Sequence, residues 1–261
     1  MGETTRAVLI TGSTSGIGLA IAKAFGAMGW RVGVNSYEPA AAVESILNAV
    51  ADAGAPEVRY FEADLGDASA SARIVEEAIA QFGALDVLVN NAGVQKVAPV
   101  EDFPIEDWNR IRTISLDGAF QAIRAVLPGM KQRQWGRIIN IAAVHGLRGA
   151  PYKSAYVATK HALVGLTRAV ALEVAELGIT VNAICPGYVW TPLVERQLEE
   201  QMRQHGLGRE EVIRTIMLAP QPTRRFVQPE EIGALAVYLC GDMARSITGT
   251  TIAVDGGWTA K

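Results

Sequence analysis

Short apolar runs alternate with longer amphipathic segments along most of the chain. Several of the short runs are apolar at nearly every position, which is typical of β-strands covered on both faces. We predict seven strands on this pattern: Ala7–Thr11, Val32–Asn35, Val58–Phe61, Val87–Asn90, Arg137–Ile141, Thr180–Ile184 and Thr251–Val254. Apolar residues spaced by three or four, as in Ile17, Ile21 and Phe25, indicate helices between them. We predict these at Gly16–Met28, Pro39–Ala53, Ala68–Phe82, Ile105–Gln132, Ser154–Leu177 and Pro229–Leu239.

Strands that alternate with helices predict an α/β fold. Parallel strands joined by right-handed helical crossovers form a doubly wound sheet with helices on both faces. No low-complexity linker divides the 261 residues, and α/β chains of this length commonly form one domain. We therefore predict a single Rossmann-type domain over 1–261 with a parallel sheet of about seven strands.

The segment 192–222 interrupts this alternation, because it is polar, helical in pattern and contains no predicted strand. It follows the end of a strand, where open α/β sheets place their ligands. We predict a small helical lid over a substrate site. The alternative is a surface helical hairpin that contributes only to packing.

Composition and charge exclude several classes of protein. The formal net charge of −3 gives no basic surface for nucleic acid or a membrane. No uncharged run approaches the roughly 20 residues that span a bilayer, and the first residues lack the layout of a signal peptide. Two cysteines make no disulfide framework, and no spacing of Cys, His and carboxylates indicates a metal site. We expect a cytoplasmic protein without nucleic-acid or membrane partners.

A glycine-rich turn, TGSTSGIG at 11–18, follows the first predicted strand. Glycines let a pyrophosphate approach the backbone, and the next helix offers free N–H groups and the positive end of its dipole. Its spacing is not the usual G-x-G-x-x-G, so the position after an N-terminal strand supports the interpretation. Asp64, after the third strand, could bind an adenine amino group or could be a turn or N-cap residue.

Several motifs in order along the chain resemble the short-chain dehydrogenase/reductase family. They are TGSTSGIG, Asp64, Asn90-Asn91-Ala92-Gly93, Tyr156-x-x-x-Lys160, and Pro186-Gly187 with Thr191. The resemblance implies a nicotinamide dinucleotide, with contacts from Gly12, Thr14, Ser15, Gly16, Ile17, Gly18, Asn35, Tyr37, Asp64, Leu65, Asn91, Ala92, Gly93, Tyr156, Lys160, Pro186, Gly187, Val189 and Thr191.

The end of the second strand bears on the choice of cofactor. An acidic residue there would bind the ribose and repel a 2′-phosphate. Residues 35–38 read Asn-Ser-Tyr-Glu, so an Asp is missing but Glu38 is near. Because the glycine turn also lacks a cation, we predict NAD rather than NADP.

Tyr156 and Lys160 are four residues apart and share one face of a predicted helix. A free phenol has a pKa of about 10, and an ammonium about 4–6 Å away can lower it by about 1–3 units. The oxidised nicotinamide would add a second positive charge, so we expect Tyr156 to exchange the proton of an alcohol while hydride moves to or from the nicotinamide. The resemblance implies that Lys160 also holds the nicotinamide ribose and that Thr191 binds the carboxamide.

Two partners that the family usually supplies are missing. Ala143 stands where a Ser would polarise the substrate oxygen, and Ser115 stands where an Asn would support a proton relay to the lysine. Ser115 could hold a water, whereas Ala143 cannot donate a hydrogen bond. Loss of one such donor typically costs about 10²–10³ in turnover. We expect a slow enzyme unless another donor, such as His145, substitutes.

A narrower resemblance is to the bacterial D-3-hydroxybutyrate dehydrogenases, carried by GRIINIA-x-x-HGL, KSAYVA-x-KH, ICPGYV-x-TPLVE-x-Q and DGGWTA. It implies a small hydroxy or keto acid as substrate. Its carboxylate would contact Gln95, His145, Lys153 and Gln197, and Tyr188 and Trp258 would form aromatic walls. Two alternatives remain, a 3-oxoacyl-thioester reductase and an inactive dinucleotide-binding relative. The resemblance also suggests a homotetramer.

Overall fold

The computed structural model describes residues 5–260 and contains a sheet of seven parallel strands. The strands are β1 (Ala7–Ile10), β2 (Arg31–Ser36), β3 (Val58–Glu62), β4 (Val87–Asn90), β5 (Gly136–Ile141), β6 (Ile179–Pro186) and β7 (Thr251–Val254). Their order across the sheet is β3-β2-β1-β4-β5-β6-β7, so the direction of winding reverses between β1 and β4. Ligands of such sheets bind at the carboxyl ends of the strands near that reversal.

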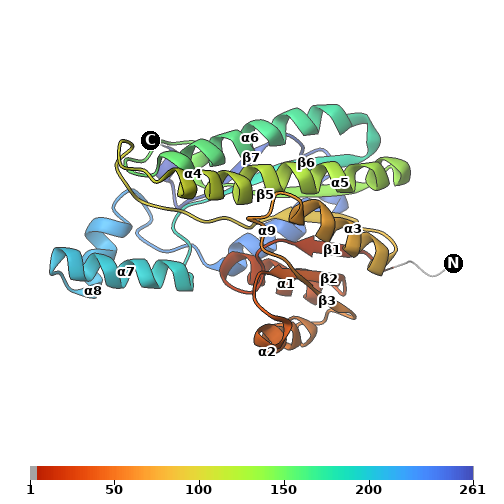
Figure 1. Cartoon of the computed structure of the whole chain (residues 1–261), viewed down its shortest axis with the longest axis horizontal. Coiled ribbons are helices and arrows are strands. Elements are labelled where there is room, and N and C mark those ends of the chain that lie inside the picture. Colours follow the sequence, from red (N-terminus) through yellow and green to blue (C-terminus); the bar gives the residue numbers. More distant parts are fainter. Residues whose placement is uncertain (1–4, 261) are drawn as a thin grey trace.

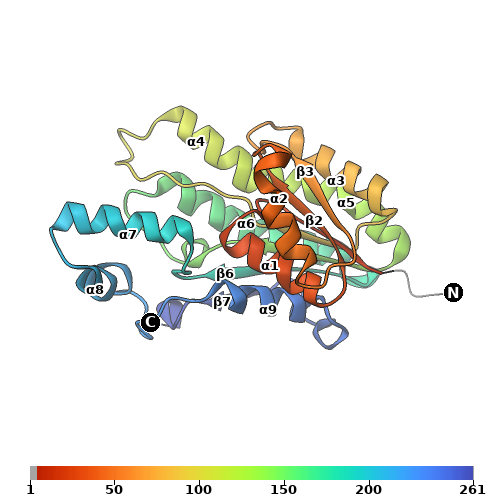
Figure 2. The ribbon, with the colours of Figure 1, turned by 90° about the horizontal axis from the view of Figure 1, so that it is seen from below.

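Helices cover both faces of the sheet (Figure 1, Figure 2). One face packs against α1 (Gly16–Ala27), α2 (Ala40–Ala51) and α9 (Pro229–Cys240). The other packs against α3 (Ala70–Phe82), α5 (Gly118–Arg133) and α6 (Ser154–Val174). The predicted single-domain, doubly wound α/β fold is confirmed.

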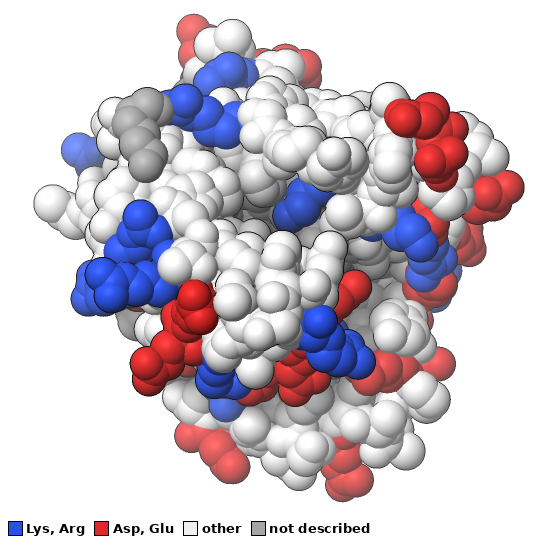
Figure 3. Space-filling view, turned by 90° about the vertical axis from the view of Figure 1, so that its left-hand side faces the viewer, with Lys and Arg blue, Asp and Glu red and all other residues white. Residues whose placement is uncertain are grey.

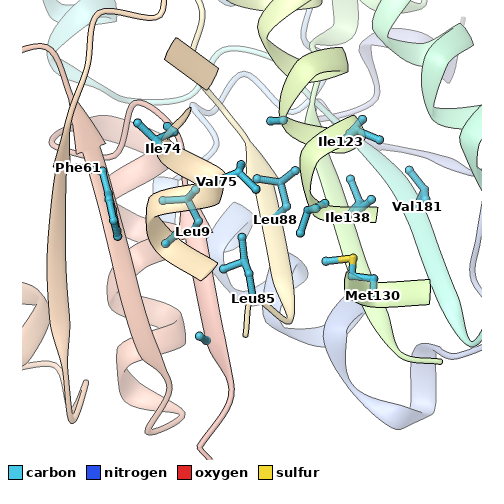
Figure 4. Close-up of a cluster of buried hydrophobic side chains, with 14 of the residues drawn as sticks. Leu9, Phe61, Ile74, Val75, Leu85, Leu88, Ile123, Met130, Ile138 and Val181 are labelled. Carbon is cyan, nitrogen blue, oxygen red and sulfur yellow. The ribbon is translucent and has the colours of Figure 1, made fainter. Parts of the chain in front are cut away.

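Strand β1 contributes side chains to the hydrophobic cores on both faces of the sheet. Ala7 and Leu9 belong to the core beneath α3, α5 and α6, whereas Val8 and Ile10 belong to the core beneath α1 and α9. All four are fully buried, because successive side chains of a strand point to opposite faces and both faces are covered. Figure 4 shows part of the first core, with labelled side chains Leu9, Phe61, Ile74, Val75, Leu85, Leu88, Ile123, Met130, Ile138 and Val181.

The predicted helix Ile105–Gln132 forms, but a π-helical turn that the prediction did not include lies within it. It consists of α4 (Ile105–Arg112), a π-helical turn at Thr113–Asp117 and then α5. The wider turn inserts a residue into the helical repeat, which places both Ile114 and Ser115 in the interior. The apolar pattern is the same on both sides of the π-helical turn, so the sequence does not reveal that turn.

The segment 192–222 contains α7 (Pro192–His205), α8 (Arg209–Val212) and a π-helical turn at Ile213–Met217, and no strand. In Figure 1 α7 and α8 project from the left side of the molecule. Thr191 caps α7 by accepting a hydrogen bond from the Val194 amide at 3.3 Å, and Gly206 ends the helix at a positive φ of 64°. A small apolar cluster of its own, formed by Val194, Leu198, Val212 and Met217, holds the segment together.

A buried chain of polar side chains crosses the middle of the fold. The Asn90 amide donates to the Asn140 oxygen at 2.8 Å, and the Asn140 amide donates to the Thr167 hydroxyl at 2.9 Å. The Thr167 hydroxyl donates to the Leu163 carbonyl at 2.8 Å. These bonds join β4, β5 and α6 just below the edge where the candidate site lies.

Replacing Asn140 should therefore weaken the whole fold. Asn140→Ala leaves the buried Asn90 amide and the Thr167 hydroxyl without this partner, and we expect the free energy of unfolding to fall by about 2–4 kcal/mol. Urea denaturation followed by circular dichroism measures this. Asn109→Ala, an exposed change on α4, should stay within about 0.5 kcal/mol of the parent. Equal stability of the two variants would contradict the assignment.

Candidate active site

The glycine turn after β1 brings two parts of the backbone unusually close. Gly12 and Gly16 have positive φ values of 60° and 53°, a conformation that favours glycine. A Cβ added at Gly18 would lie 2.4 Å from the Gly12 carbonyl oxygen, which is closer than real Cβ contacts. Helix α1 begins at Gly16, and no side chain of the described residues caps its N-terminus. The first amides of α1 are therefore available to an anion.

Side chains from two neighbouring strands hold this turn in place. The Gly12 amide donates to the Asn35 side-chain oxygen at 3.1 Å, and Asn35 is almost fully buried. The Asn91 side chain donates to the carbonyls of Thr11 and Gly12 at 2.9 and 2.8 Å. Asn35 and Asn91 thus shape the turn, in addition to lining the cleft beside it.

A cleft of about 540 Å³ opens at this edge of the sheet. It is lined by most of the predicted cofactor residues: Gly12, Thr14, Ser15, Gly16, Ile17, Gly18, Asn35, Tyr37, Asp64, Leu65, Asn91, Ala92, Gly93 and Thr191. The open glycine cradle and the free helix N-terminus fit the pyrophosphate of a dinucleotide. A second cavity shares Ile17, Thr191 and Leu193 with the cleft. Of the other predicted contacts, Lys160 lines neither space, and this cavity is lined by Pro186, Gly187, Val189 and Tyr156.

Glu38 is fixed at one end of the cleft by two hydroxyl groups. Thr14 and Ser36 both donate to the same Glu38 carboxylate oxygen, at 3.1 and 3.0 Å. The Tyr60 hydroxyl donates to the Glu38 backbone carbonyl. The carboxylate is thus held between the glycine turn and the end of β2, where a cofactor ribose would lie.

Asp64 lines the same cleft but is already engaged. Its carboxylate accepts a hydrogen bond from the Gly66 amide at 2.8 Å and two from Arg110, at 3.3 and 3.2 Å. The Gly66 hydrogen bond first, and Arg110 further, lower the pKa of Asp64. Asp64 is therefore a turn residue that also lines the cleft, and its contact with an adenine stays a prediction.

Tyr156 and Lys160 meet at the carboxyl end of β5, as their spacing on α6 predicts. The Lys160 ammonium lies 5.6 Å from the centre of the Tyr156 ring and donates to the Ile141 carbonyl at 2.7 Å. Tyr156 lines the second cavity, whereas Lys160 is buried behind Gly93. A Cβ at Gly93 would lie 3.5 Å from the Lys160 nitrogen, so glycine leaves that nitrogen room.

The predicted effect of Lys160 on the tyrosine is wrong for these residues taken alone. Burial raises the pKa of Tyr156 to about 12, and burial lowers the pKa of Lys160 to about 8. Each shift disfavours the charged form, because the site excludes water. The lysine therefore does not outweigh desolvation, and a phenolate here requires a further positive charge.

Ala143 and Ser115 occupy the positions at which the family usually has a Ser and an Asn, and both lie next to the site. Ala143 lines the second cavity and offers a methyl group to it. Ser115 is buried, and a Cβ at Gly93 would be 3.4 Å from its hydroxyl oxygen, so Ser115 and Lys160 flank the same glycine. The Ser115 hydroxyl and the Asn90 side-chain oxygen have no hydrogen-bond partner within residues 5–260. Both residues line an internal cavity of about 10 Å³, which is about enough for one water.

The second cavity, of about 150 Å³, collects every predicted substrate residue. Its lining includes Gln95, His145, Lys153, Tyr188, Gln197 and Trp258, together with Tyr156 and Ala143. These residues come from five separate parts of the chain. Amide, imidazole and ammonium groups thus face one small space beside the Tyr156 ring, an arrangement that can bind an anion.

Aromatic rings form one wall of this cavity. The His145 ring meets Tyr156 and Trp258 edge to face, with centroid distances of 6.1 and 5.4 Å, and Tyr188 stacks on Trp258 at 5.7 Å. Burial, followed by the charge of Lys153, lowers the pKa of His145 to about 4. Burial also lowers the pKa of Lys153. The pocket therefore disfavours positive charge until an anion enters.

Among the residues that line the dinucleotide cleft and that sequence reasoning missed, three come from helices beside it. Arg110 reaches it from α4, and Leu193 and Arg196 reach it from α7. Leu193 and Arg196 are three residues apart on one helical face, a signal that was available in the sequence. The contact between Arg110 and Asp64 joins positions 46 apart and had no such signal.

The cleft, the glycine cradle and the Tyr-Lys pair at the edge of a parallel sheet define a nicotinamide-dependent oxidoreductase. This chain belongs to the short-chain dehydrogenase/reductase family, whose dehydrogenases use nicotinamide dinucleotides. The family described as "Enoyl-(Acyl carrier protein) reductase" matches residues 12–259.

Among known proteins, the chain is similar to two bacterial enzymes named D-beta-hydroxybutyrate dehydrogenase. It is 49% identical to that of Rhizobium meliloti over 98% of this chain and 100% of the relative. It is 48% identical to that of Cupriavidus necator over 98% of each chain. The crystal structure of levodione reductase superposes with a TM-score of 0.89 at 33% identity and covers 98% of each chain. The chain is therefore an oxidoreductase enzyme.

Residues 5–260 contain neither a membrane-spanning helix nor a cluster of metal-binding side chains. None of the helices there is both long and apolar enough to cross a membrane. Groups of three or more His, Cys, Asp or Glu residues that could hold a metal ion do not occur in that range. Figure 3 shows the end of the molecule that carries α7, where basic and acidic side chains are interspersed and form no large patch of one sign.

The low pKa of His145 predicts a pH-dependent stability. The unfolded chain takes up this proton near the ordinary pKa of 6.5 and the folded protein only near 4, so the stabilisation is complete above pH 6.5 and is lost as the pH falls towards 4. The expected loss is about 3 kcal/mol. Urea denaturation from pH 7 to 4 should show it in the parent and not in His145→Gln. An exposed change, His205→Gln, is the control and should follow the parent, and parallel curves for all three would refute the prediction.

Proposed function

We propose that this enzyme interconverts D-3-hydroxybutyrate and acetoacetate with NAD and NADH. The single observation that carries the proposal is the small cavity beside Tyr156, in which Gln95, His145, Lys153 and Gln197 face one space. A monocarboxylate needs a few convergent donors, and a four-carbon chain fits a short apolar remainder. The names of the two bacterial relatives support the same substrate.

Glu38 supports NAD as the cofactor. Its carboxylate is held by Thr14 and Ser36 at the end of β2, where it would accept hydrogen bonds from ribose hydroxyls. A 2′-phosphate at that place would meet a fixed negative charge. The glycine turn itself supplies no cation to offset this repulsion.

In the proposed reaction, different residues would bind the cofactor and transfer the proton. The glycine turn and the first amides of α1 would bind the pyrophosphate, Asn91 keeps that turn in shape, and Thr191 would bind the carboxamide. When bound, the nicotinamide accepts or gives hydride, and its oxidised ring supplies positive charge. Tyr156 would exchange the substrate proton at its hydroxyl oxygen, and Lys160 would support the phenolate and hold the ribose.

The same geometry supports a slow enzyme. The substrate oxygen would lie beside the methyl group of Ala143, which cannot stabilise charge that develops on it. Ser115 keeps a hydroxyl near Lys160, but it is shorter than the usual amide. We infer that turnover is reduced and that binding of cofactor and acid is largely retained.

Two further expectations stay predictions. The segment 192–222 is proposed as a substrate lid, because Gln197 on α7 faces the substrate cavity and the segment has its own apolar cluster. A homotetramer is proposed, with α6 and the C-terminal region at interfaces.

Restoring the missing hydroxyl tests the proposed reaction. Ala143→Ser should raise turnover of D-3-hydroxybutyrate with NAD by about 10²–10³-fold, because a donor then faces the substrate oxygen. The absorbance of reduced nicotinamide measures it, with each enantiomer of the acid paired with NAD or NADP. Ala150→Ser, the same change further along the same loop at a residue that lines neither cavity, is the matched control and should give no gain.

The outcomes separate the alternatives. Cofactor binding without hydride transfer to acetoacetate, in both the parent and Ala143→Ser, would indicate an inactive dinucleotide-binding relative. Turnover in the parent that Ala143→Ser does not increase would mean that another group already polarises the oxygen. Faster reaction with the L enantiomer or with NADP would overturn the substrate or cofactor assignment.

Lys153 distinguishes a free acid from a 3-oxoacyl thioester. Lys153→Met removes a charged donor from the cavity, so the KM for 3-hydroxybutyrate should rise by about 10–100-fold with a smaller change in kcat. Steady-state kinetics on the Ala143→Ser background measures the split. Lys96→Met, an exposed lysine paired with Asp107, is the control. A thioester reductase would reduce a 3-oxoacyl thioester with NADPH and lose nothing in Lys153→Met.

A further inference from the structure

Helix α7 presents neighbouring residues to two different cavities. Arg196 lines the dinucleotide cleft, and the next residue, Gln197, lines the substrate cavity. Leu193, one turn earlier, lines both. One helix therefore faces the cofactor and the substrate at the same time.

The start of α7 lies against the glycine turn. A Cβ added at Gly16 would meet the Thr191 methyl carbon at 3.2 Å, and Thr191 is the residue that caps α7. Gly16 is also the first residue of α1, whose free amides face the expected pyrophosphate. Because Leu193 and Arg196 share a face of α7, Arg196 is directed to the cleft one turn beyond this contact.

Arg196 lines the cleft with a guanidinium that no described side chain pairs with. Two basic residues line it within residues 5–260, Arg110 and Arg196. Arg110 is paired with Asp64 at 3.2 Å, whereas no carboxylate or carbonyl in this range binds the Arg196 guanidinium. At the end of the molecule that carries α7, basic and acidic side chains are interspersed (Figure 3). A guanidinium with free donors suits a pyrophosphate, which it can bind with two parallel hydrogen bonds.

We propose that Arg196 is a positioning residue that binds the cofactor pyrophosphate and so draws α7 towards the cleft, with Gln197 then presented to the substrate. The proposal rests on a dinucleotide in the cleft and not on the identity of the acid. The apolar cluster of Val194, Leu198, Val212 and Met217 makes α7 and α8 one unit, so a pull at Arg196 moves both. Cofactor binding would precede assembly of the substrate cavity.

The test measures ligand binding without turnover. Arg196→Gln should weaken NADH and ADP-ribose, which both carry the pyrophosphate, by about 5–20-fold and leave adenosine unchanged. Quenching of protein fluorescence gives the affinities, with adenosine measured by displacement of NADH. Arg203→Gln removes the same charge from an exposed position of α7 that lines neither cavity, and it should match the parent. Arg196→Lys should recover part of the loss.

Movement of α7 has its own readout. NADH should slow proteolytic cleavage within 192–222 in the parent and in Arg203→Gln, and this protection should be smaller in Arg196→Gln. Unchanged NADH affinity in Arg196→Gln would overturn the proposal, as would an equal loss for adenosine. A loss confined to NADPH would also overturn it and assign Arg196 to a 2′-phosphate. None of these results depends on which acid the enzyme oxidises.

Discussion

The close approach between the Gly12 carbonyl and the start of α1 is the constraint on which the site depends. Gly18 can lie there only because it lacks a Cβ, and Asn35 and Asn91 fix the carbonyls and amides on either side. This contact sets where α1 begins and therefore where its free amides point. Gly16, which also lacks a Cβ, leaves room for Thr191, so that segment 192–222 starts beside the same turn. The dinucleotide cleft, the second cavity and the start of α7 therefore all lie next to this turn.

Burial at this edge has a common electrostatic effect. It raises the pKa of Tyr156 and lowers the pKa values of Lys160, Lys153 and His145, so each group is biased towards its neutral form. An oxidised nicotinamide would offset the first bias and a carboxylate the last two, because each brings the opposite charge into a dry site. Binding of a charged ligand would therefore shift the pKa values of Tyr156, Lys153 and His145 back towards the charged form of each residue.

The sequence predicts the parts of this structure that have a local or ordered signal. Seven apolar runs became the seven strands, and the spacing of Tyr156 and Lys160 placed them on one face of α6. The π-helical turn at Thr113–Asp117 has no such signal, because the apolar pattern continues through it. The direction of the Tyr156 pKa shift also could not be predicted, since it depends on how much water the packed helices and strands exclude.

The substitutions at Ala143 and Ser115 differ in physical consequence. Ala143 lines the cavity without offering a donor, so in the proposed reaction charge that develops on the substrate oxygen would lack support there. Ser115 retains a buried hydroxyl that shares a small cavity with the Asn90 oxygen, where a water would satisfy both groups. In the proposed reaction, the first change would act on the chemical step and the second on the delivery of protons to Lys160. Because neither touches the glycine turn or the carboxylate donors, loss of rate need not be accompanied by loss of binding, and rate and affinity report on different residues of the same site.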